Sequence, residues 1–522
     1  MALLLALAVP MQTTLAQVRL PSLGESAAVD LPVGTERRLG HEVMDEIRRD
    51  PQYLDDPVLQ EYVSSVFQPL VAAARKLGNI GPDIDHAFAW QVFLLDDRAV
   101  NAFALPGGYI GVYLGMIALT DTEDELASVL AHELSHVTQR HIARKIVNAQ
   151  HSSMVGMAAL VLAILAASRS GNADAAQAAM VGGQAAAIQG QINFSREVES
   201  EADRMGFGVL DAAHFDTAGM YEMFQKLQTA SRINDDGSFP FLRDHPLTTE
   251  RIAEARSRAL TEHGGPPAPP LRPALMQMRA KVLMDRDPQA LRRWEQLGSG
   301  IPRISLRDRL AAMYGGALAA SLLGHPAVAE RHADDALALA RTAVPREPLA
   351  ERDLQLLQVQ LAIARHDPAA ALRVLDSISV DANGRAPLLM RAQAALALQQ
   401  YGSDAAATAA ALRASTEALH TWVAEHGNDA TAWGLLSQTS EAIGQRLRSL
   451  RASAEAHAAV GDLVGAIDRL HAGQKLARDP KGEQDFIEAS VIDARLRELQ
   501  AQRRQQLRDA RGGGDGFRAF EQ

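Results

Sequence analysis

The segment with the clearest chemical capacity is His132-Glu133-Leu134-Ser135-His136. On a helix, residues four apart lie on one face, so two imidazoles can reach a single metal ion with a carboxylate beside them. Two histidines leave a tetrahedral zinc ion with room for a third protein ligand and a water. Zinc lowers the pKa of that water, and Glu133 is placed to take its proton. The spacing therefore predicts a zinc-dependent hydrolase with His132 and His136 as ligands.

The competing interpretation, a helix with incidental histidines, explains this motif less well. No other pair among the chain's 16 histidines is four residues apart. Thr120 with Glu123 offers a capping box that would begin the helix. An apolar stripe would give that helix a buried face: Leu126, Val129, Leu130 and Val137.

A third ligand must come from elsewhere, and the acidic segment 195–203 offers carboxylates. Glu199 and Asp203 lie one helical turn apart on one face. In this arrangement Glu199 would be the ligand, and Asp203 would accept a hydrogen bond that orients a ligand histidine. Acidic helical surfaces are common, however, and spacing alone does not exclude Glu201.

The elements expected around the motif are helices and a small sheet. Strand-like runs occur at residues 90–95, 101–105 and 109–113, which predicts an α+β unit. The last two runs flank the turn Pro106-Gly107-Gly108 and come just before the motif helix. An edge strand here can bind an extended polypeptide by strand addition, or the hairpin can be purely structural. The residues predicted for the substrate strand are Asn101, Phe103, Ala104 and Tyr109.

The C-terminal half is expected to be all-helical. Residues 264–270 are almost entirely Gly and Pro, which neither continue a helix nor join a sheet, so 264–273 reads as a linker after a metallopeptidase domain at 17–263. From 274 to 511, amphipathic helices alternate with short turns, for example at Pro326, Pro368 and Asp404. Their spacings, 42 and 36 residues, are somewhat longer than the roughly 34-residue period of tetratricopeptide repeats but resemble it. A non-repeat helical bundle is the alternative, and 512–522 reads as a flexible tail.

Two apolar segments bear on the location of the protein. Residues 1–16 fit a secretory signal peptide with a small-residue cleavage site, although no Lys or Arg precedes the apolar run; a frayed or buried helix is the alternative. Residues 154–167 are too few to span a membrane, so we expect a buried or membrane-surface element there. We therefore expect an exported protein.

Composition excludes several classes of function. The net charge is −11, from 52 basic and 63 acidic residues, and the chain has no long basic block. A phosphate-driven nucleic-acid binder is therefore not expected. The chain has no cysteine, which excludes disulfides, thiolate metal ligands and cysteine nucleophiles.

The histidine motif, followed about sixty residues on by Glu199-x-x-x-Asp203, resembles metallopeptidase family 48, the HtpX- and Oma-type zinc endopeptidases. Residues 20–24, 101–108 and 244–246 resemble a branch of that family in the Gram-negative periplasm that joins its catalytic domain to C-terminal tetratricopeptide repeats. The resemblance implies a gluzincin-type zincin fold in which Glu199 completes the zinc site and Asp203 supports it. It also implies that His245 can approach the zinc, as an extra ligand or a switch that keeps the enzyme latent. Taken alone, a histidine before Pro246 reads as a turn residue.

The function that the resemblance implies is quality control of outer-membrane β-barrel proteins. The expected enzyme is a periplasmic zinc endopeptidase with one zinc per chain and a chaperone-like role. It would be soluble or in peripheral contact with the outer membrane, would degrade misassembled clients, and would dock on the barrel assembly machinery through its repeats. The alternative is an assembly scaffold or chaperone with a latent metal site. An integral membrane peptidase would need spans that the sequence does not offer.

Overall fold

The computed structural model describes residues 31–148, 196–233, 239–259, 270–298, 305–478 and 485–518. The predicted signal peptide, the family-like segment 20–24, the apolar segment 154–167 and most of the Pro/Gly linker lie outside these ranges. The elements up to residue 259 are α2 (Val33–Arg49), β1 (Tyr53–Leu54), α3 (Pro57–Lys76), α4 (Pro82–Ala87), β2 (Gln91–Leu95), β3 (Ala102–Leu105), β4 (Tyr109–Tyr113), α5 (Leu114–Leu119), α6 (Glu123–Thr138), α7 (His141–Asn148), α11 (Arg196–Ala212), α12 (Ala218–Ile233), α13 (Pro240–Asp244) and α14 (Thr249–Ala259).

The second half of the chain is an array of helices. They are α15 (Leu271–Leu283), α16 (Pro288–Gly298), α17 (Leu306–Leu322), α18 (Pro326–Ala340), α19 (Pro348–Ala364), α20 (Pro368–Ser377), α21 (Arg385–Tyr401), α22 (Ala405–Glu425), α23 (Ala430–Ala442), α24 (Arg446–Ala459), α25 (Leu463–Ala477) and α26 (Phe486–Arg518).

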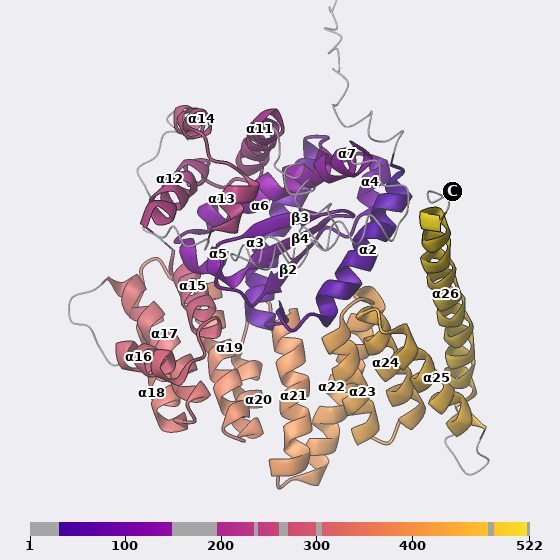
Figure 1. The fold of residues 1–522 in the computed structure, drawn as a ribbon. Helices are drawn as coiled ribbons and strands as arrows, with labels where there is room; N and C mark the ends of the chain where they lie inside the picture. The colour runs from indigo at the N-terminus through magenta and orange to yellow at the C-terminus, as the bar shows by residue number, and fades with distance from the viewer. Residues whose placement is uncertain are drawn as a thin grey trace, which may run out of the picture.

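The sheet has four strands in the order β1-β2-β4-β3. β2 and β4 are parallel, whereas β1 and β3 pair antiparallel with β2 and β4 respectively. The three predicted strands are confirmed. β1 was missed because a strand of two residues carries no alternating pattern. The order leaves β3, the strand before the turn at Pro106, at an edge of the sheet (Figure 1).

The helix that carries the histidine motif, α6, packs between the sheet and other helices. It contacts β3 on one side and α3, α11 and α12 on others. Every residue from Glu125 to Thr138 is buried, so the helix is enclosed all round rather than on the predicted stripe alone. α11 approaches it closely: a Cβ on Gly206 would lie 3.2 Å from the backbone carbonyl of Ala131. This approach brings the acidic segment of α11 to the motif.

The predicted start of α6 is wrong by two residues. Thr122, not Thr120, is the N-cap, and its hydroxyl accepts from the Glu125 amide at 3.2 Å. The pattern Thr-x-x-Glu occurs twice in succession, at Thr120 with Glu123 and at Thr122 with Glu125. Thr120 instead ends α5, so only the second pair is available to cap α6.

The helices from α15 to α26 pack mainly on their neighbours in sequence, and Figure 1 shows them as a row of roughly antiparallel helices beside the first domain. The turns predicted at Pro326, Pro368 and Asp404 separate helices as expected. Among the described residues after 270 there is no strand. The described elements agree with the predicted fold class, an α+β domain followed by an all-helical region. α15 begins inside the predicted linker, at Leu271, and α26 runs to Arg518, through most of the predicted tail.

Two ion pairs, one buried and one partly buried, join the array to the N-terminal end of α3. Arg279 on α15 is 1% exposed and donates to both carboxylate oxygens of Asp56, at 2.8 and 2.6 Å. Arg385 on α21 likewise donates to both oxygens of Asp55, at 2.7 Å each. Guanidinium groups that bind carboxylates by two parallel hydrogen bonds fix orientation as well as distance. The array is therefore held against the first domain at this point.

No helix in the described part of the chain is both long and apolar enough to cross a membrane.

Candidate metal centre

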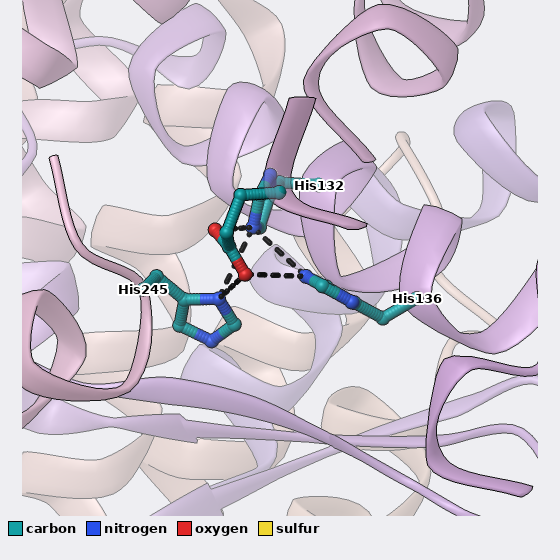
Figure 2. A group of neighbouring side chains, drawn as sticks. His132, His136 and His245 are labelled. Atoms are coloured by element: carbon teal, nitrogen blue, oxygen red, sulfur yellow. Dashed lines mark hydrogen bonds and ion pairs between the residues drawn. The ribbon is translucent and has the colours of Figure 1, made fainter. Parts of the chain in front are cut away.

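Four side chains that can bind a metal meet in the interior of the first domain. The ligand atoms of His132, His136, Glu199 and His245 lie within 4.8 Å of one another, and all four residues are buried. Figure 2 shows the three imidazoles converging on one point between α6 and the segment that follows α13. The Nε2 atoms of the two motif histidines are 3.0 Å apart. Glu199 places one oxygen 3.5 Å from His132 Nε2 and the other 3.6 Å from His136 Nε2.

His245 lies against both the ligand cluster and the motif glutamate. Its Nδ1 is 3.1 Å from Glu199 Oε1 and 3.3 Å from His132 Nε2, and its Nε2 is 3.5 Å from Glu133 Oε1. The backbone of α13 positions the imidazole, because the His245 amide donates to the Phe241 carbonyl at 2.7 Å. The imidazole therefore stands between the metal-binding atoms and the predicted general base.

Glu133 is oriented as a proton acceptor would have to be. It is 1% exposed, and its Oε1 has no hydrogen-bond partner among the described residues. The backbone amide of Ala104 on β3 donates to the same carboxylate. Burial raises the pKa of Glu133 above its usual value, although His245 and His132 oppose the shift. A raised carboxylate pKa suits a general base that works near neutral pH.

Asp203 lies where a hydrogen bond can orient His132. The Nδ1 atom of His132 is 2.9 Å from Asp203 Oδ1, which leaves Nε2 directed at the ligand cluster. Arg251 on α14 donates to both oxygens of Asp203, at 2.6 and 2.7 Å, and its Nη1 lies 2.9 Å from Glu199 Oε2. The same guanidinium donates to the Pro246 carbonyl at 2.9 Å. One arginine thus holds the orienting carboxylate, the candidate ligand carboxylate and the loop after His245.

Sequence reasoning missed Arg251. It lies on a short helix with Glu250, Glu254, Arg256 and Arg258, and this charge pattern is typical of a solvated helical face. Only the folded chain shows that Arg251 points inward, at 7% exposure, towards residues about fifty positions earlier.

The histidines in and beside the cluster differ in ionisation. Burial lowers the pKa of His136 well below its usual value and that of His141, the first residue of α7, to about 3, so both imidazoles are neutral. Burial also opposes a charge on His132, but hydrogen bonds to Asp203 and Glu199 outweigh it and raise its pKa to about 10. In the metal-free protein the imidazole of His132 is therefore protonated on both ring nitrogens, and metal binding would displace the proton on Nε2.

The donor set fits zinc. Two imidazoles and one carboxylate, with a further position open, are typical of catalytic zinc sites. The contact between His132 and Asp203 also fits such a site, since ligand histidines commonly donate their second ring N–H to a carboxylate.

The predicted substrate-strand residues fall on two strands and the residue before one of them. Ala104 lies on the edge strand β3, with its amide directed at Glu133. Asn101 precedes this strand and is 1% exposed, and neither polar atom of its side chain has a hydrogen-bond partner in the described ranges. Phe103 packs edge-on against Tyr113 of β4. Tyr109 lies on β4, inside the sheet, and its hydroxyl is 2.9 Å from His41 Nδ1.

Comparison with known proteins places this site in a family. The model of peptidase family M48 matches residues 58–259. The β-barrel assembly-enhancing protease of Yersinia pestis is 30% identical over 487 residues, which cover 93% of this chain and 92% of that relative. The chain belongs to peptidase family M48. The membership confirms the resemblance inferred from the motifs and the predicted enzyme class, a zinc metalloendopeptidase.

Other M48 relatives match the chain over different lengths. The β-barrel assembly-enhancing protease of Escherichia coli K12 is 28% identical over 503 residues, 92% of each chain. The mitochondrial metalloendopeptidase OMA1 of Saccharomyces cerevisiae is 25% identical over 195 residues, or 36% of this chain and 53% of that protein. The bacterial relatives thus match both the peptidase domain and the helical array.

Proposed function

We propose that this M48 peptidase acts in the periplasm, where it supports the assembly of outer-membrane β-barrel proteins and degrades clients that fail to assemble. The observation that carries the proposal is the match over 92% of the Yersinia pestis relative, whose name joins a protease to β-barrel assembly. A match confined to the peptidase domain would support proteolysis alone. The helical array is included in this match, which supports a role specific to the family branch.

Within the site, we propose that His132, His136 and Glu199 hold one zinc ion per chain. When bound, zinc supplies Lewis-acid polarisation of the scissile carbonyl and of a water. Glu133 accepts a proton from the attacking water and later returns it to the leaving amine. Asp203, held by Arg251, keeps the His132 proton on Nδ1 and so leaves Nε2 available.

His245 is proposed to keep the resting enzyme latent. Its ring nitrogens lie 3.1 Å from Glu199 and 3.5 Å from Glu133, so the imidazole occupies the space between ligand and base that a scissile peptide needs. If about a tenth of the molecules have this imidazole withdrawn, its removal raises the competent fraction roughly tenfold. We therefore expect His245→Ala to raise the basal rate of casein cleavage by about that factor.

The measurement compares initial rates for the purified wild type and the variant at equal zinc content. His86→Ala, which removes an exposed imidazole on α4, is the control and should leave the rate unchanged. A His245→Ala enzyme that keeps its zinc but cleaves no faster would reject the latent state.

We propose that substrate binds as an added strand along β3. The Tyr113 amide donates to the Asn101 carbonyl, and Phe103 pairs with Gly111. The backbone N–H and C=O groups of the odd-numbered residues of β3 therefore face β4. The period of two then turns the backbone of Ala102 and Ala104 towards the open edge. Because the Ala104 amide donates to Glu133, the groups proposed to pair with substrate are the Ala102 amide and carbonyl and the Ala104 carbonyl. Main-chain pairing there gives affinity with little sequence preference, which suits an enzyme that cleaves unfolded chains.

Asn101 is expected to hydrogen-bond the substrate main chain. The buried Asn101 amide has no hydrogen-bond partner among the described residues, which destabilises the free enzyme, so Asn101→Ala should leave the thermal midpoint equal to or above that of the wild type. The loss of a hydrogen bond worth about 1 kcal/mol should raise KM for a peptide substrate roughly fivefold. Steady-state kinetics and a thermal melt test both expectations, and a lower midpoint with unchanged KM would assign Asn101 to the fold instead.

A second function is favoured by the position of His245. Three imidazoles and a carboxylate can fill a tetrahedral zinc site without a water, which is typical of a structural site. In that case the chain would act mainly as a scaffold or chaperone, with α15–α26 as tetratricopeptide-like repeats that bind the barrel assembly machinery. Stacked helices of this kind present an extended surface to partners.

The experiment that separates the two functions is complementation. A Gram-negative host without its own related protease would receive the wild type or Glu133→Gln, and the amounts of assembled and unassembled outer-membrane proteins would be compared. Rescue by the wild type alone supports the peptidase, whereas equal rescue supports the scaffold. Fractionation of the same cells tests the periplasmic location.

A further inference from the structure

The second motif histidine contacts an imidazole outside the ligand cluster. His136 Nδ1 lies 2.8 Å from His141 Nδ1, and His141 Nε2 lies 3.3 Å from Glu201 Oε2. Arg144 Nη2 is 3.4 Å from the same Glu201 oxygen. His136, His141 and Glu201 are all buried. A chain of hydrogen-bonding groups thus runs from His136 outward to a carboxylate on α11.

The direction of the hydrogen bonds follows from the position of the ligand cluster. His136 faces that cluster with Nε2, so Nε2 must present a lone pair to a metal and the ring proton must be on Nδ1. His141 Nδ1 can accept this proton only if its own proton is on Nε2. That Nε2–H then donates to Glu201. A neutral imidazole has one donor and one acceptor nitrogen, and His141 uses both in these two hydrogen bonds.

The turn before His141 fixes the place of its ring. Arg140 has a φ of 52°, in the left-handed region, which costs energy for a residue with a Cβ. Its guanidinium donates to Glu36 at 2.8 Å and to the Leu31 carbonyl at 2.6 Å, and all these groups are buried. Contacts with α2 and the segment before it therefore hold the α6–α7 turn in a conformation that would otherwise be unfavourable. This turn directs the ring of the first residue of α7 at His136.

We propose that His141 and Glu201 are positioning residues for zinc, which fix the tautomer and ring orientation of His136. The inference rests on the proposed zinc site. The other ligand histidine has the same arrangement, because His132 contacts the carboxylate of Asp203. Each carboxylate also has an arginine beside it: Arg251 binds Asp203, and Arg144 approaches Glu201. α11 would then supply the ligand Glu199 and, two and four residues later, the carboxylates that orient both ligand histidines.

The test is the zinc dissociation constant of the full-length protein, measured by competition with a chromophoric chelator. Loss of an outer hydrogen-bond partner typically weakens metal binding 10- to 100-fold, so His141→Phe should raise Kd by about that factor while keeping the ring shape. His141→Asn, whose amide oxygen can take the place of Nδ1 as acceptor, should recover part of the affinity. His141→Gln, whose amide lies nearer the Nε2 position, should recover less.

Two further measurements distinguish positioning from a general loss of structure. His41→Phe removes another histidine of the same domain and should leave Kd unchanged, since His41 contacts Tyr109 away from the cluster. The visible absorption of the cobalt-substituted enzyme reports ligand geometry, and it should change in His141→Phe but not in His41→Phe.

The outcomes separate this inference from the proposed function. A wild-type protein that binds no zinc would overturn the proposed site. A wild type that binds zinc, with His141→Phe folded by circular dichroism and equal to it in Kd and cobalt spectrum, would overturn only the role of His141. If His141→Phe does not fold, Glu201→Ala gives the same comparison, and an unchanged Kd in that variant also rejects the proposal.

Discussion

Glu133→Gln should lower kcat for casein cleavage by about 10²- to 10⁴-fold, the range that a positioned general base contributes. The amide has the size of the carboxylate but accepts no proton at neutral pH. Glu133 is not among the four residues whose ligand atoms cluster, so zinc content should stay near one per chain. The measurement is kcat together with metal analysis of the same sample.

The matched control for this variant is Glu197→Gln on α11. Glu197 is exposed and lies outside the ligand cluster, and its replacement makes the same chemical change. It should leave both kcat and zinc content at wild-type values. A Glu133→Gln enzyme that retains more than a tenth of the wild-type kcat would contradict the role of Glu133 as the base.

Arg279→Ala should lower the free energy of unfolding by roughly 3–5 kcal/mol, the usual cost of leaving one partner of a buried ion pair uncompensated. The guanidinium binds both oxygens of Asp56, and it also donates to the Tyr314 hydroxyl and the Gln360 amide oxygen, each at 2.9 Å. Asp56 additionally caps α3 by accepting from the Leu59 amide at 2.9 Å. The loss of Arg279 would therefore also weaken the N-cap of α3, a core helix of the peptidase domain. Urea denaturation followed by circular dichroism gives the free energy.

An exposed ion pair that joins the same two parts of the chain provides the control. Arg98 Nη2 is 2.7 Å from Asp285 just after α15, but the arginine side chain is 65% exposed. Exposed pairs contribute about 0–1 kcal/mol, so Arg98→Ala should change stability little. Equal changes in the free energy of unfolding for the two substitutions would show that burial does not increase the contribution of the Arg279 pair to stability.

The parts of the site that depend on local spacing could be predicted from sequence. His132 and His136 share a helical face through their separation of four, and Glu199 and Asp203 do so for the same reason. Spacing could not choose between Glu199 and Glu201, because either can face the motif depending on how α11 is rotated. In the structure Glu199 lies in the ligand cluster, and Glu201 contacts His141 instead.

The orienting contact of Asp203 with a ligand histidine was predicted, but the contacts of His141, Arg251 and Arg279 could not be. His141 follows the motif at a separation of five from His136, which is off the face of one continuous helix, and it reaches His136 only because the turn at Arg140 starts a new helix. Arg251 lies on a helix whose charges suggest a solvated surface, and Arg279 is a basic residue within a mostly apolar helix. Their inward positions depend on packing between segments far apart in the chain, which periodicity within one segment does not encode.

The edges of elements were the least predictable part of the fold. Two overlapping Thr-x-x-Glu patterns made the start of α6 ambiguous. The glycine-rich residues after Arg511 suggested an end to helical structure, yet α26 continues to Arg518. Whether a segment is a strand or a helix could be predicted, because the hydrophobic pattern that distinguishes the two extends over several residues.

The close approach of α11 to α6 at Gly206 has a consequence for the spacing of residues on α11. Glu199, Glu201 and Asp203 each point to a different target, and Gly206 sets the rotation of the helix that carries them. One residue inserted between Asp203 and Gly206 would turn all three carboxylates by about 100° relative to that contact. The ligand and both orienting groups would then leave their targets together, although every amino-acid type was retained. The chemistry of the centre thus depends on the count of residues along one helix as strictly as on their identity.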